Sequence, residues 1–307
     1  MQQIMVVAGP TASGKTNFAV CLAKKYGGEV VSADSIQIYQ ELNIASAKPT
    51  KEEMGDIPHH MLDMVSPFDR FSVADYVAKA KTAIDGILSH NALPIVAGGT
   101  GLYISSLVDN IEFLDSACDM GVREALLLRV ETEGIMPLYE ELKKIDPKAA
   151  MNIHPNNAKR VVRALEIFET TGMTLTEQNE RSRQNPSPYE PFMIALCPPR
   201  ELLYERIDQR VDQMVNMGLL EESKRLKDMG LSREMQSMQG IGYKEVFDYL
   251  EGKVTLDDCI ANIKKATRHY AKRQLTWFRR DERYHWVNPM DEQAIESVLE
   301  EFTWERP

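Results

Sequence analysis

The sequence lacks the features of membrane-spanning, secreted and zinc-binding proteins. Its longest apolar runs, Ile4–Ala8 and Ala92–Ala97, are far shorter than the ~20 residues of a transmembrane helix. The N-terminus enters an apolar run without a basic segment or a cleavage site, so we expect no signal peptide, no membrane contact and a cytoplasmic location. Four widely separated cysteines predict reduced thiols rather than disulfides or a zinc site: Cys21, Cys118, Cys197 and Cys259.

The sequence also has no excess of positive charge. The 307 residues contain 36 Lys and Arg against 46 Asp and Glu, a formal net charge of −10, and 43% of them are hydrophobic. This composition is typical of a globular protein with enough chain for a substantial core, in one or two domains. The acidic total argues mildly against nucleic acid as a partner, although a local basic face decides that question.

Short β-favouring runs alternate with helical patterns in much of the chain. Strands are predicted at Gln3–Ala8, Glu29–Ala33, Leu93–Ala97 and Phe192–Cys197, and near Arg283–Val287. Helices are predicted from the first glycine-rich loop to Tyr26, over Val73–Leu88 with Ser72 as N-cap, near Gly101 and from Arg200. This alternation predicts an α/β fold, a parallel sheet with helices on both faces.

The middle of the chain has a different character. Between residues 119 and 183 only helical patterns occur, at Val122–Glu133, Leu138–Ile145 and Asn156–Thr171. We therefore predict a discontinuous α/β core, residues 1–114 and 190–307, interrupted by a helical insert domain at residues 115–189.

The strongest motif is a phosphate-binding loop. Residues 9–16 match G-x-x-x-x-G-K-[ST] at every fixed position, after a strand and before a helix. In this pattern backbone N–H groups surround phosphate oxygens, the lysine adds a cation, and the last hydroxyl faces Mg²⁺. A chance glycine turn is the alternative. The motif predicts that a di- or triphosphate binds to Gly9, Pro10, Thr11, Ala12, Ser13, Gly14, Lys15 and Thr16.

Two more candidates lie where parallel strands are expected to end. Asp34 follows the second strand, and at that edge of the sheet its carboxylate suits a general base, a metal ligand or a helix N-cap. Thr100, within Gly98–Tyr103, follows the next strand along the chain and suits a donor to phosphate. A plain turn explains the glycines around Thr100 equally well.

A kinase is the first interpretation of the loop alone. The apolar strand ending in Asp that usually accompanies such a loop is missing, since the strand at 93–97 is followed by Gly98. This is weak evidence against nucleotide hydrolysis. Asp34 and Asp63 are the candidate substitutes for that missing carboxylate.

Basic residues are concentrated in two segments of this acidic chain. Between residues 264 and 283, eight basic residues stand against two acidic ones, and Lys265, Arg268 and Lys272 share a helix face. A second basic group begins at Lys159 in the insert. Such segregation suits a polyanion. An ordinary solvated helix face is the alternative.

Arg206 and Arg210 lie one helical turn apart after the strand at 192–197. Since the end of that strand is expected to face the phosphate loop, one of the two arginines would reach a leaving phosphate. Pairing with nearby carboxylates on the same helix is the alternative.

Taken together, these segments resemble the tRNA dimethylallyltransferases over nearly the whole chain. The motifs that carry the resemblance are residues 9–16, Ser32–Tyr39, Pro58–Asp63, Gly98–Tyr103, Asp146-Pro147, Asn156–Glu166, Thr171-Gly172, Arg206–Met214, Gly240–Glu245 and Lys272–Arg279. Gly240 departs slightly, because the family often places another small residue there.

The resemblance implies a P-loop NTPase-like core and a reaction. Family members transfer a dimethylallyl group from dimethylallyl diphosphate to N6 of adenine 37, just 3′ of the anticodon, and release diphosphate. By resemblance the loop holds that diphosphate, with Mg²⁺ at Thr16, and Lys15, Thr100 and Arg210 act at the reacting centre. Asp34 matches the general base of the family.

The resemblance also implies a surface for the tRNA anticodon stem-loop. The matching positions are Asp34, Ser35, Ile36, Gln37, Thr100, Arg123, Ala158, Lys159, Arg160, Val161, Val162, Arg163, Arg268, Lys272, Arg273 and Gln274. Nothing in the sequence indicates more than a monomer.

Three other functions stay open. A P-loop kinase of a small metabolite would transfer phosphate from ATP. A prenyltransferase acting on free adenine nucleotides would need neither the insert nor the basic helix. An RNA-binding module with a vestigial loop conflicts with the complete set of Gly14, Lys15, Thr16 and Asp34.

Overall fold

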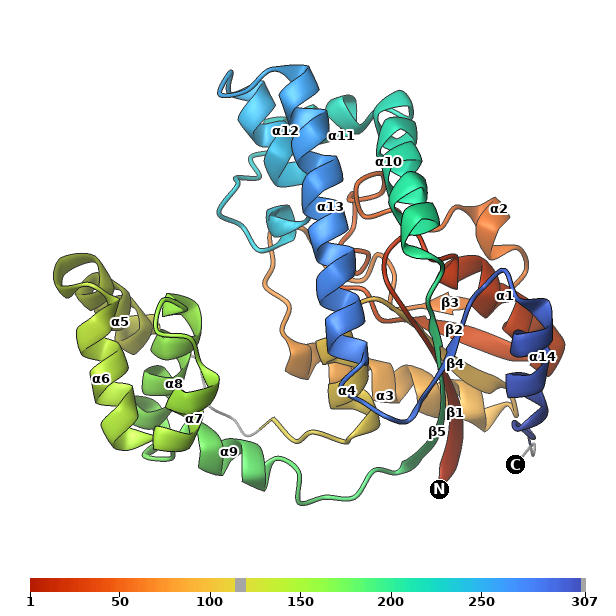
Figure 1. Cartoon of the computed structure of the whole chain (residues 1–307), viewed down its shortest axis with the longest axis horizontal. Coiled ribbons are helices and arrows are strands. Elements are labelled where there is room, and N and C mark those ends of the chain that lie inside the picture. Colours follow the sequence, from red (N-terminus) through yellow and green to blue (C-terminus); the bar gives the residue numbers. More distant parts are fainter. Residues whose placement is uncertain (114–119, 305–307) are drawn as a thin grey trace. The chain divides into compact units, whose positions relative to one another are not determined.

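The computed structural model describes residues 1–113 and 120–304, and its central element is a six-stranded sheet. The strand order is β3-β2-β4-β1-β5-β6, and every neighbouring pair is parallel (Figure 1). The strands are β1 (Gln2–Ala8), β2 (Gly28–Ser32), β3 (His59–His60), β4 (Leu93–Gly98), β5 (Tyr189–Leu196) and β6 (Tyr284–Val287). The predicted parallel α/β sheet is confirmed.

The sequence of β1 shows why the sheet is covered on both faces. Ile4, Val6 and Ala8 belong to the larger hydrophobic core, whereas Met5 and Val7 belong to a second core. Successive side chains of a strand point to opposite faces, so a strand covered on both faces has a continuous apolar run. The two cores therefore lie on opposite sides of the sheet.

One strand was absent from the sequence prediction. β3 contains only His59–His60, at the edge of the sheet beside β2. Two polar residues form no hydrophobic pattern, and the pairing of His59 with Val30 is a tertiary contact. Strands this short carry no periodic signal.

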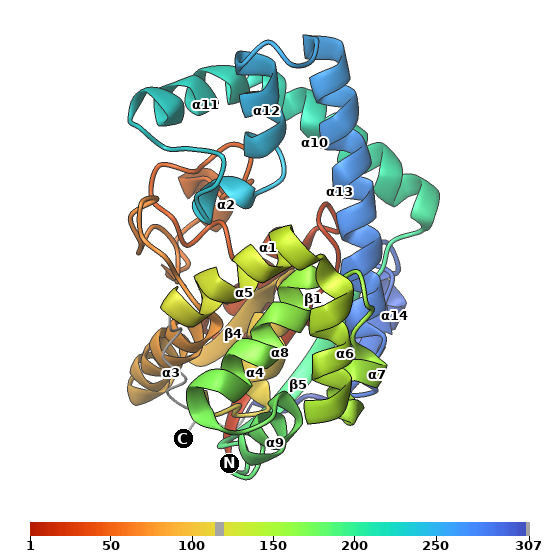
Figure 2. The same ribbon diagram turned by 90° about the vertical axis from the view of Figure 1, so that its left-hand side faces the viewer.

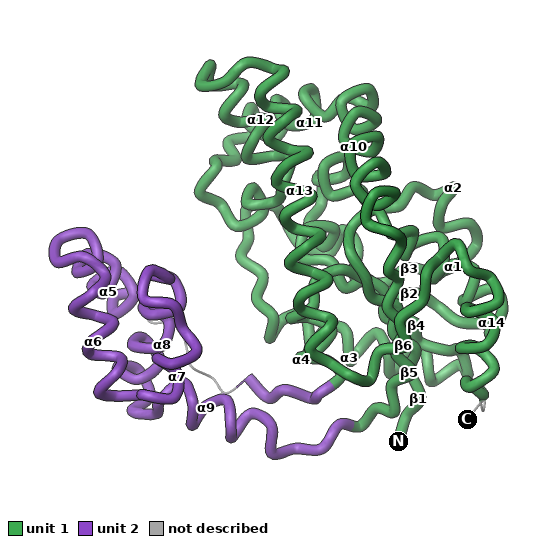
Figure 3. The backbone as a smooth tube through the Cα atoms, in the orientation of Figure 1, with its two compact units in different colours: residues 1–108, 188–307 green, residues 109–187 purple. Residues whose placement is uncertain are grey.

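By its contacts the chain divides into two compact units (Figure 3). Unit 1 consists of residues 1–108 and 188–307 and contains the sheet, and unit 2 consists of residues 109–187. Besides the short 3-10 helix η1 (Ser237–Gln239), the helices of unit 1 are α1 (Lys15–Tyr26), α2 (Lys51–Met54), α3 (Val73–Ser89), α4 (Gly101–Val108), α10 (Arg200–Asn216), α11 (Leu219–Asp228), α12 (Tyr243–Leu250), α13 (Leu256–Phe278) and α14 (Glu292–Glu300).

Local signals fix several of these helix ends. The Ser72 hydroxyl accepts a hydrogen bond from the backbone N–H of Asp75 at 3.2 Å, and Asp75 accepts one from the N–H of Ser72 at 2.8 Å. This capping box begins α3 where the sequence predicts it. Gly27, in the left-handed conformation, ends α1.

The long helix α13 links distant parts of unit 1. It contacts α12 near its beginning, runs beside α10 and reaches α4 near its end (Figures 1 and 2). Residues far apart in the sequence are thereby held along one helix.

Unit 2 is helical in its described part, as the sequence predicts for the insert. Its helices are α5 (Met120–Glu133), α6 (Ile135–Ile145), α7 (Pro147–Asn152), α8 (Ala158–Thr171) and α9 (Leu175–Arg181). They surround a core that includes Leu138, Leu142 and Leu165. The expected insert, residues 115–189, lies close to these limits, and residues 114–119 are outside the described part. The short helices α7 and α9 were not predicted.

In residues 1–113 and 120–304, every helix is too short or too polar to span a membrane. Cys21, Cys197 and Cys259 are free thiols, in agreement with the prediction, and Cys118 lies outside the described residues.

Candidate active site

The phosphate loop connects β1 to α1, and its backbone depends on two glycines. Gly9 has a φ of 142°, and a Cβ atom there would lie 2.6 Å from the backbone oxygen of Leu196. Gly14 has a φ of 91° and directly precedes Lys15, the first residue of α1. Glycine adopts such angles without steric cost, so the fold of the loop requires both fixed glycines of the motif. The loop leads into a helix N-terminus, which favours anionic oxygens.

Two polar side chains inside the loop turn towards the loop itself. The Ser13 hydroxyl is buried and has no hydrogen-bond partner in the described part of the chain. Lys15 Nζ donates to the backbone oxygen of Pro10 at 2.6 Å. A buried hydroxyl without a partner costs free energy, and an anion in the loop would supply acceptors for both groups.

The ends of β2 and β4 meet next to the loop. A Cβ atom on Gly98, the last residue of β4, would lie 2.2 Å from the backbone oxygen of Ala33, so only glycine permits this approach. The approach brings Thr100 to the segment after β2, where its Oγ1 accepts a hydrogen bond from the N–H of Ser35 at 3.1 Å. Thr100 therefore supports the turn that carries Asp34.

The two carboxylate oxygens of Asp34 have different surroundings. Oδ1 accepts hydrogen bonds from the backbone N–H groups of Ile36 at 2.9 Å and Gln37 at 3.3 Å. Among the described residues Oδ2 accepts no hydrogen bond. The helix N-cap interpretation of Asp34 is wrong, because a turn and not a helix follows β2. One oxygen caps that turn, while the other is available for chemistry.

These groups open into one cavity of about 450 Å³ in unit 1. Its lining includes the predicted residues Lys15 and Thr16 from α1, Asp34 from the segment after β2, and Arg210. Arg210 comes from α10, and its Nη1 lies 3.5 Å from the Thr11 hydroxyl. Arg206, one turn earlier, lies elsewhere, with Nη2 3.3 Å from Met290 Sδ. Of the two arginines, Arg210 is therefore the one that faces the phosphate loop.

Two half-buried cations, Lys15 and Arg210, give the cavity an excess of positive charge. Burial and the Arg210 charge together lower the pKa of Lys15 to about 7, although the Asp34 charge partly opposes them. Burial also lowers the pKa of Arg210, against the attraction of Glu53 and Asp34. Burying cations without full compensation is unfavourable. The cavity is thus suited to a ligand that carries several negative charges.

Gln274 connects α13 to the loop. Its side chain is 5% exposed; Oε1 accepts from the backbone N–H of Thr11 at 2.8 Å, and Nε2 donates to the backbone oxygen of Gly99 at 2.9 Å. The resemblance implies a tRNA contact for this residue, but the structure gives its amide two backbone partners within unit 1. It also lines the cavity, on the side of α13.

Tyr270 is a cavity residue that the sequence analysis missed. Burial and the nearby Asp34 charge raise the pKa of its hydroxyl, and the side chains of Thr100 and Gln274 partly oppose that rise. Thr267, Tyr270 and Gln274 recur at spacings of three and four along α13, and all three line the cavity. That spacing was the available signal, obscured by the basic residues between them.

The basic residues of α13 have unequal surroundings. Arg268 Nη1 lies 2.6 and 2.8 Å from the carboxylate oxygens of Asp208, and Lys264 Nζ lies 2.7 Å from Asp212. Lys272 is exposed, and Arg273 lines the cavity with its guanidinium 5.7 Å from the Tyr270 ring centre. Some of this charge therefore joins α13 to α10, and some faces solvent or the cavity.

Ser35, Ile36 and Gln37 line the cavity beside Asp34. Asp63 does not lie in the lining; its Oδ1 accepts from Lys48 Nζ at 2.5 Å. Of the two carboxylates considered as substitutes in a kinase, Asp34 alone therefore faces the phosphate loop.

The remaining expected tRNA residues lie in unit 2. Arg123 is half-buried on α5, and Lys159 and Arg160 are exposed at the beginning of α8. Val161 and Val162 are buried in the core of unit 2, so their side chains pack the helix rather than face a ligand. Ala158 and Arg163 are partly exposed, and Arg163 Nη1 lies 3.2 Å from Glu166.

Comparison with known proteins gives concordant matches. The family model of IPP transferases matches residues 37–281. A tRNA dimethylallyltransferase of Acetivibrio thermocellus is 46% identical over 299 residues, which cover 97% of this chain and 96% of that protein. One from Halalkalibacterium halodurans is also 46% identical, over 97% of this chain and 95% of that protein.

Solved structures resemble the whole chain. The tRNA isopentenylpyrophosphate transferase of Bacillus halodurans superposes with a TM-score of 0.72 at 44% identity, covering 97% of this chain and 95% of that one. A eukaryotic dimethylallyltransferase acting on tRNA gives a TM-score of 0.82 at 29% identity, covering 98% of this chain and 77% of that one. Together with the cavity at the phosphate loop, these matches show that the chain belongs to the IPP transferase family.

Proposed function

We propose that the protein transfers a dimethylallyl group from dimethylallyl diphosphate to N6 of adenine 37 in tRNA and releases diphosphate. The observation that carries the proposal is one cavity whose lining contains two half-buried cations, Lys15 and Arg210, and the carboxylate of Asp34. The cations suit a diphosphate leaving group. The carboxylate suits an acceptor for the proton of an attacking amine.

The leaving group is held by the phosphate loop. Backbone N–H groups at the start of α1 and the Lys15 ammonium surround the diphosphate, and Arg210 reaches it from α10. As the allylic C–O bond breaks, negative charge grows on the diphosphate oxygen. These positioned cations are more favourable in that state than in the bound substrate, and so they lower the barrier.

The nucleophile needs a base, because the lone pair of the adenine N6 amine is delocalised into the ring. In the proposed reaction a bond forms between N6 and the allylic carbon, and one N6 proton passes to Asp34 Oδ2. Oδ1 stays bonded to the backbone of Ile36 and Gln37, which keeps the carboxylate oriented. Adenine must leave its stack to reach the cavity, which costs a few kcal/mol in a duplex and less in a loop.

The residues present fit a magnesium ion shared with the substrate. Among the described residues no group of three acidic, histidine or cysteine side chains could enclose a metal. Thr16 lines the cavity at the helix start and offers one hydroxyl. Mg²⁺ is commonly held by one or two side chains plus phosphate oxygens, so Thr16 would be its protein ligand. When bound, the ion would add positive charge to the leaving group.

We also propose that tRNA contacts the exposed basic residues of α13 and of the start of α8. Lys272 in unit 1, and Lys159 and Arg160 in unit 2, are exposed cations in an otherwise acidic chain. A cytoplasmic location and a monomeric state belong to the same proposal, and they rest on the sequence features and on tRNA as the substrate.

The test is incubation of the protein with dimethylallyl diphosphate, Mg²⁺ and unmodified tRNA, followed by mass analysis of the nucleosides. The expected product is prenylated adenosine from the anticodon loop alone. Product from adenosine monophosphate at an equal rate would favour prenylation of free nucleotides. Phosphoryl transfer from ATP without prenylation would favour a kinase.

A further inference from the structure

Glu222 is a buried carboxylate that the proposed reaction does not use. It lies on α11, 8% exposed. Its oxygens accept hydrogen bonds from the N–H groups of Asn43, at 3.3 Å, and Ile44, at 2.9 and 3.2 Å. The hydroxyl of Tyr243, a fully buried residue of α12, donates to Oε1 at 2.7 Å. A carboxylate so deeply buried needs such donors, so the contacts tie the loop at residues 43–48 to two helices.

The start of α12 packs directly on the same loop. Gly242, with a φ of 103°, precedes Tyr243, and a Cβ atom there would lie 2.7 Å from the Cβ of Ala45. This contact leaves no space for a larger residue. Gly242 at the start of α12 therefore packs against the 43–48 loop, while Glu222 fixes the backbone of that loop.

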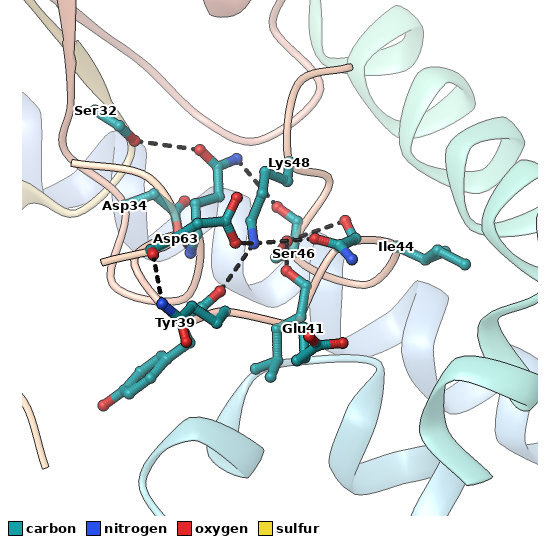
Figure 4. A network of polar contacts seen from close by, with 12 residues as sticks. Ser32, Asp34, Tyr39, Glu41, Ile44, Ser46, Lys48 and Asp63 are labelled. Atoms are coloured by element: carbon teal, nitrogen blue, oxygen red, sulfur yellow. Dashed lines mark hydrogen bonds and ion pairs between the residues drawn. The ribbon is translucent and has the colours of Figure 1, made fainter. Parts of the chain in front are cut away.

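A buried cation holds the other end of the loop (Figure 4). The Lys48 side chain is 7% exposed, and Nζ donates to the Tyr39 backbone oxygen at 2.8 Å, Asn43 Oδ1 at 3.0 Å and Asp63 Oδ1 at 2.5 Å. All three hydrogens of the ammonium are used. The loop is thereby fixed at both its beginning and its end.

The fixed loop in turn positions Gln37 beside Asp34. Gln37 Nε2 donates to the backbone oxygens of Ser46 and Ala47, both at 3.1 Å, and Oε1 accepts from the Ser32 hydroxyl at 3.2 Å. The backbone N–H of Gln37 donates to Asp34 Oδ1 at 3.3 Å. Gln37 and Asp34 both line the cavity.

We propose that Glu222, with Tyr243, is a positioning residue for the catalytic carboxylate, acting through the 43–48 loop and Gln37. This inference rests on the proposed function. The 43–48 loop lines the cavity beside Gln37, whereas the phosphate loop connects β1 to α1 and has other supporting contacts, such as the one from Gln274. Loss of the support should therefore affect the transfer step and the fit of adenine more than the binding of dimethylallyl diphosphate. A small misplacement of reacting groups costs about 10²-fold in rate.

The test compares Glu222→Gln and Tyr243→Phe with the wild type in the transfer of the dimethylallyl group to an anticodon stem-loop. Glu222→Gln keeps the size of the side chain but turns one acceptor into a donor, which opposes the backbone N–H groups. Tyr243→Phe removes one hydroxyl and should fold normally. Glu221→Gln, an exposed carboxylate on the same helix, is the matched control.

The expected result is a fall in kcat/KM for the stem-loop of about 10²-fold for Glu222→Gln and less for Tyr243→Phe. The affinity for dimethylallyl diphosphate, measured by calorimetry, should stay within twofold of the wild type. The double variant should be no slower than Glu222→Gln, because both changes act through one loop.

Two results would overturn the inference. One is wild-type kcat/KM in folded Glu222→Gln and Tyr243→Phe, with at most a lower Tm. The other is a parallel loss of affinity for dimethylallyl diphosphate. If Glu222→Gln fails to fold, Tyr243→Phe alone decides between these outcomes. A wild-type protein that does not prenylate the stem-loop would instead refute the proposed function.

Discussion

Asp34 shows how one side chain combines a structural and a chemical task. Asp34 lines the cavity; Oδ1 caps the turn after β2, and Oδ2 has no hydrogen-bond partner among the described residues. Because the two tasks fall on different oxygens, two substitutions separate them. Asp34→Asn keeps a capping oxygen and removes the base, whereas Asp34→Ala removes both.

We predict that Asp34→Asn and Asp34→Ala each lower kcat by about 10²–10⁴-fold, the usual contribution of a positioned base. Only Asp34→Ala should also lower the free energy of unfolding, by about 1 kcal/mol, because it removes the oxygen that caps the turn. Single-turnover prenyl transfer and thermal unfolding measure the two effects. Turnover of Asp34→Asn at the wild-type rate would show that another group accepts the proton.

Lys15 makes diphosphate binding depend on pH. Its pKa is lowered to about 7 by burial and by Arg210, and a bound diphosphate would raise it again. Binding should therefore take up a proton above neutral pH, and the Kd for dimethylallyl diphosphate should increase by up to about tenfold per pH unit there. Calorimetry in buffers of different ionisation enthalpy measures the uptake. Lys15→Arg, charged throughout this range, should show no uptake, and equal uptake in both proteins would contradict the assignment.

The position of the phosphate loop could be predicted, because its residues are contiguous and the motif fixes Gly9, Gly14, Lys15 and Thr16. The task of Gln274 could not be predicted in the same way. Its partners Thr11 and Gly99 lie 263 and 175 positions away in the sequence, and only the fold brings them together. Glu222 was missed for the same reason, since its partners Asn43 and Ile44 lie on a distant loop.

At the level of elements, the hydrophobic patterns of the sequence predicted strands and helices reliably. β1, β2, β4 and β5 were found from apolar runs, and α3 from its N-cap and its spacing. The helix α13 was seen mainly as a basic segment. Its buried face could be separated from its charged face only through contacts with α10 and the phosphate loop.

The two faces of α13 predict unequal effects of its lysines on RNA binding. Lys264 already pairs with Asp212 at 2.7 Å, whereas Lys272 is exposed. Lys272→Ala should weaken tRNA binding and reduce the slope of log K against log salt by about 0.7–0.9, the value for one lost phosphate contact. Lys264→Ala should change the slope less. Titration of the anticodon stem-loop over a range of salt concentrations measures both, and equal slopes for Lys272→Ala and the wild type would assign Lys272 to a solvated face.

At the level of the whole molecule, the insert was predictable because a long stretch without strand patterns interrupts an alternating α/β sequence. The hydrogen bonds that stabilise the insert from within could not be predicted. Asp146 begins α7 and is 3% exposed, and it accepts hydrogen bonds from the N–H of Ala149 at 2.9 Å and from the N–H and hydroxyl of Thr176 at 2.8 and 2.7 Å. Thr176 lies on α9, so this carboxylate joins the two short helices that the sequence analysis missed.

Burial alone would raise the pKa of Asp146, but the hydrogen bonds from Thr176 and Ala149 lower it overall. The stabilisation is therefore complete above the unfolded-state pKa of 3.8 and is lost as the pH falls through the lower folded-state value. Asp146→Ala should destabilise unit 2 by at least about 2 kcal/mol at neutral pH, since it leaves buried donors without an acceptor. The difference in the free energy of unfolding between Asp146→Ala and the wild type should become smaller at acid pH.

Unit 2 can be observed separately, because Trp277, Trp286 and Trp304 all belong to unit 1. In Asp146→Ala, helical circular dichroism should begin to fall at a lower denaturant concentration than the tryptophan fluorescence signal, whereas affinity for dimethylallyl diphosphate should stay unchanged. Lys148→Ala, which removes only an exposed pair with Glu180 on the same helices, should cost less than about 1 kcal/mol. If both signals shift together in Asp146→Ala, the two units unfold as one cooperative body, and the carboxylate stabilises the whole chain rather than the insert.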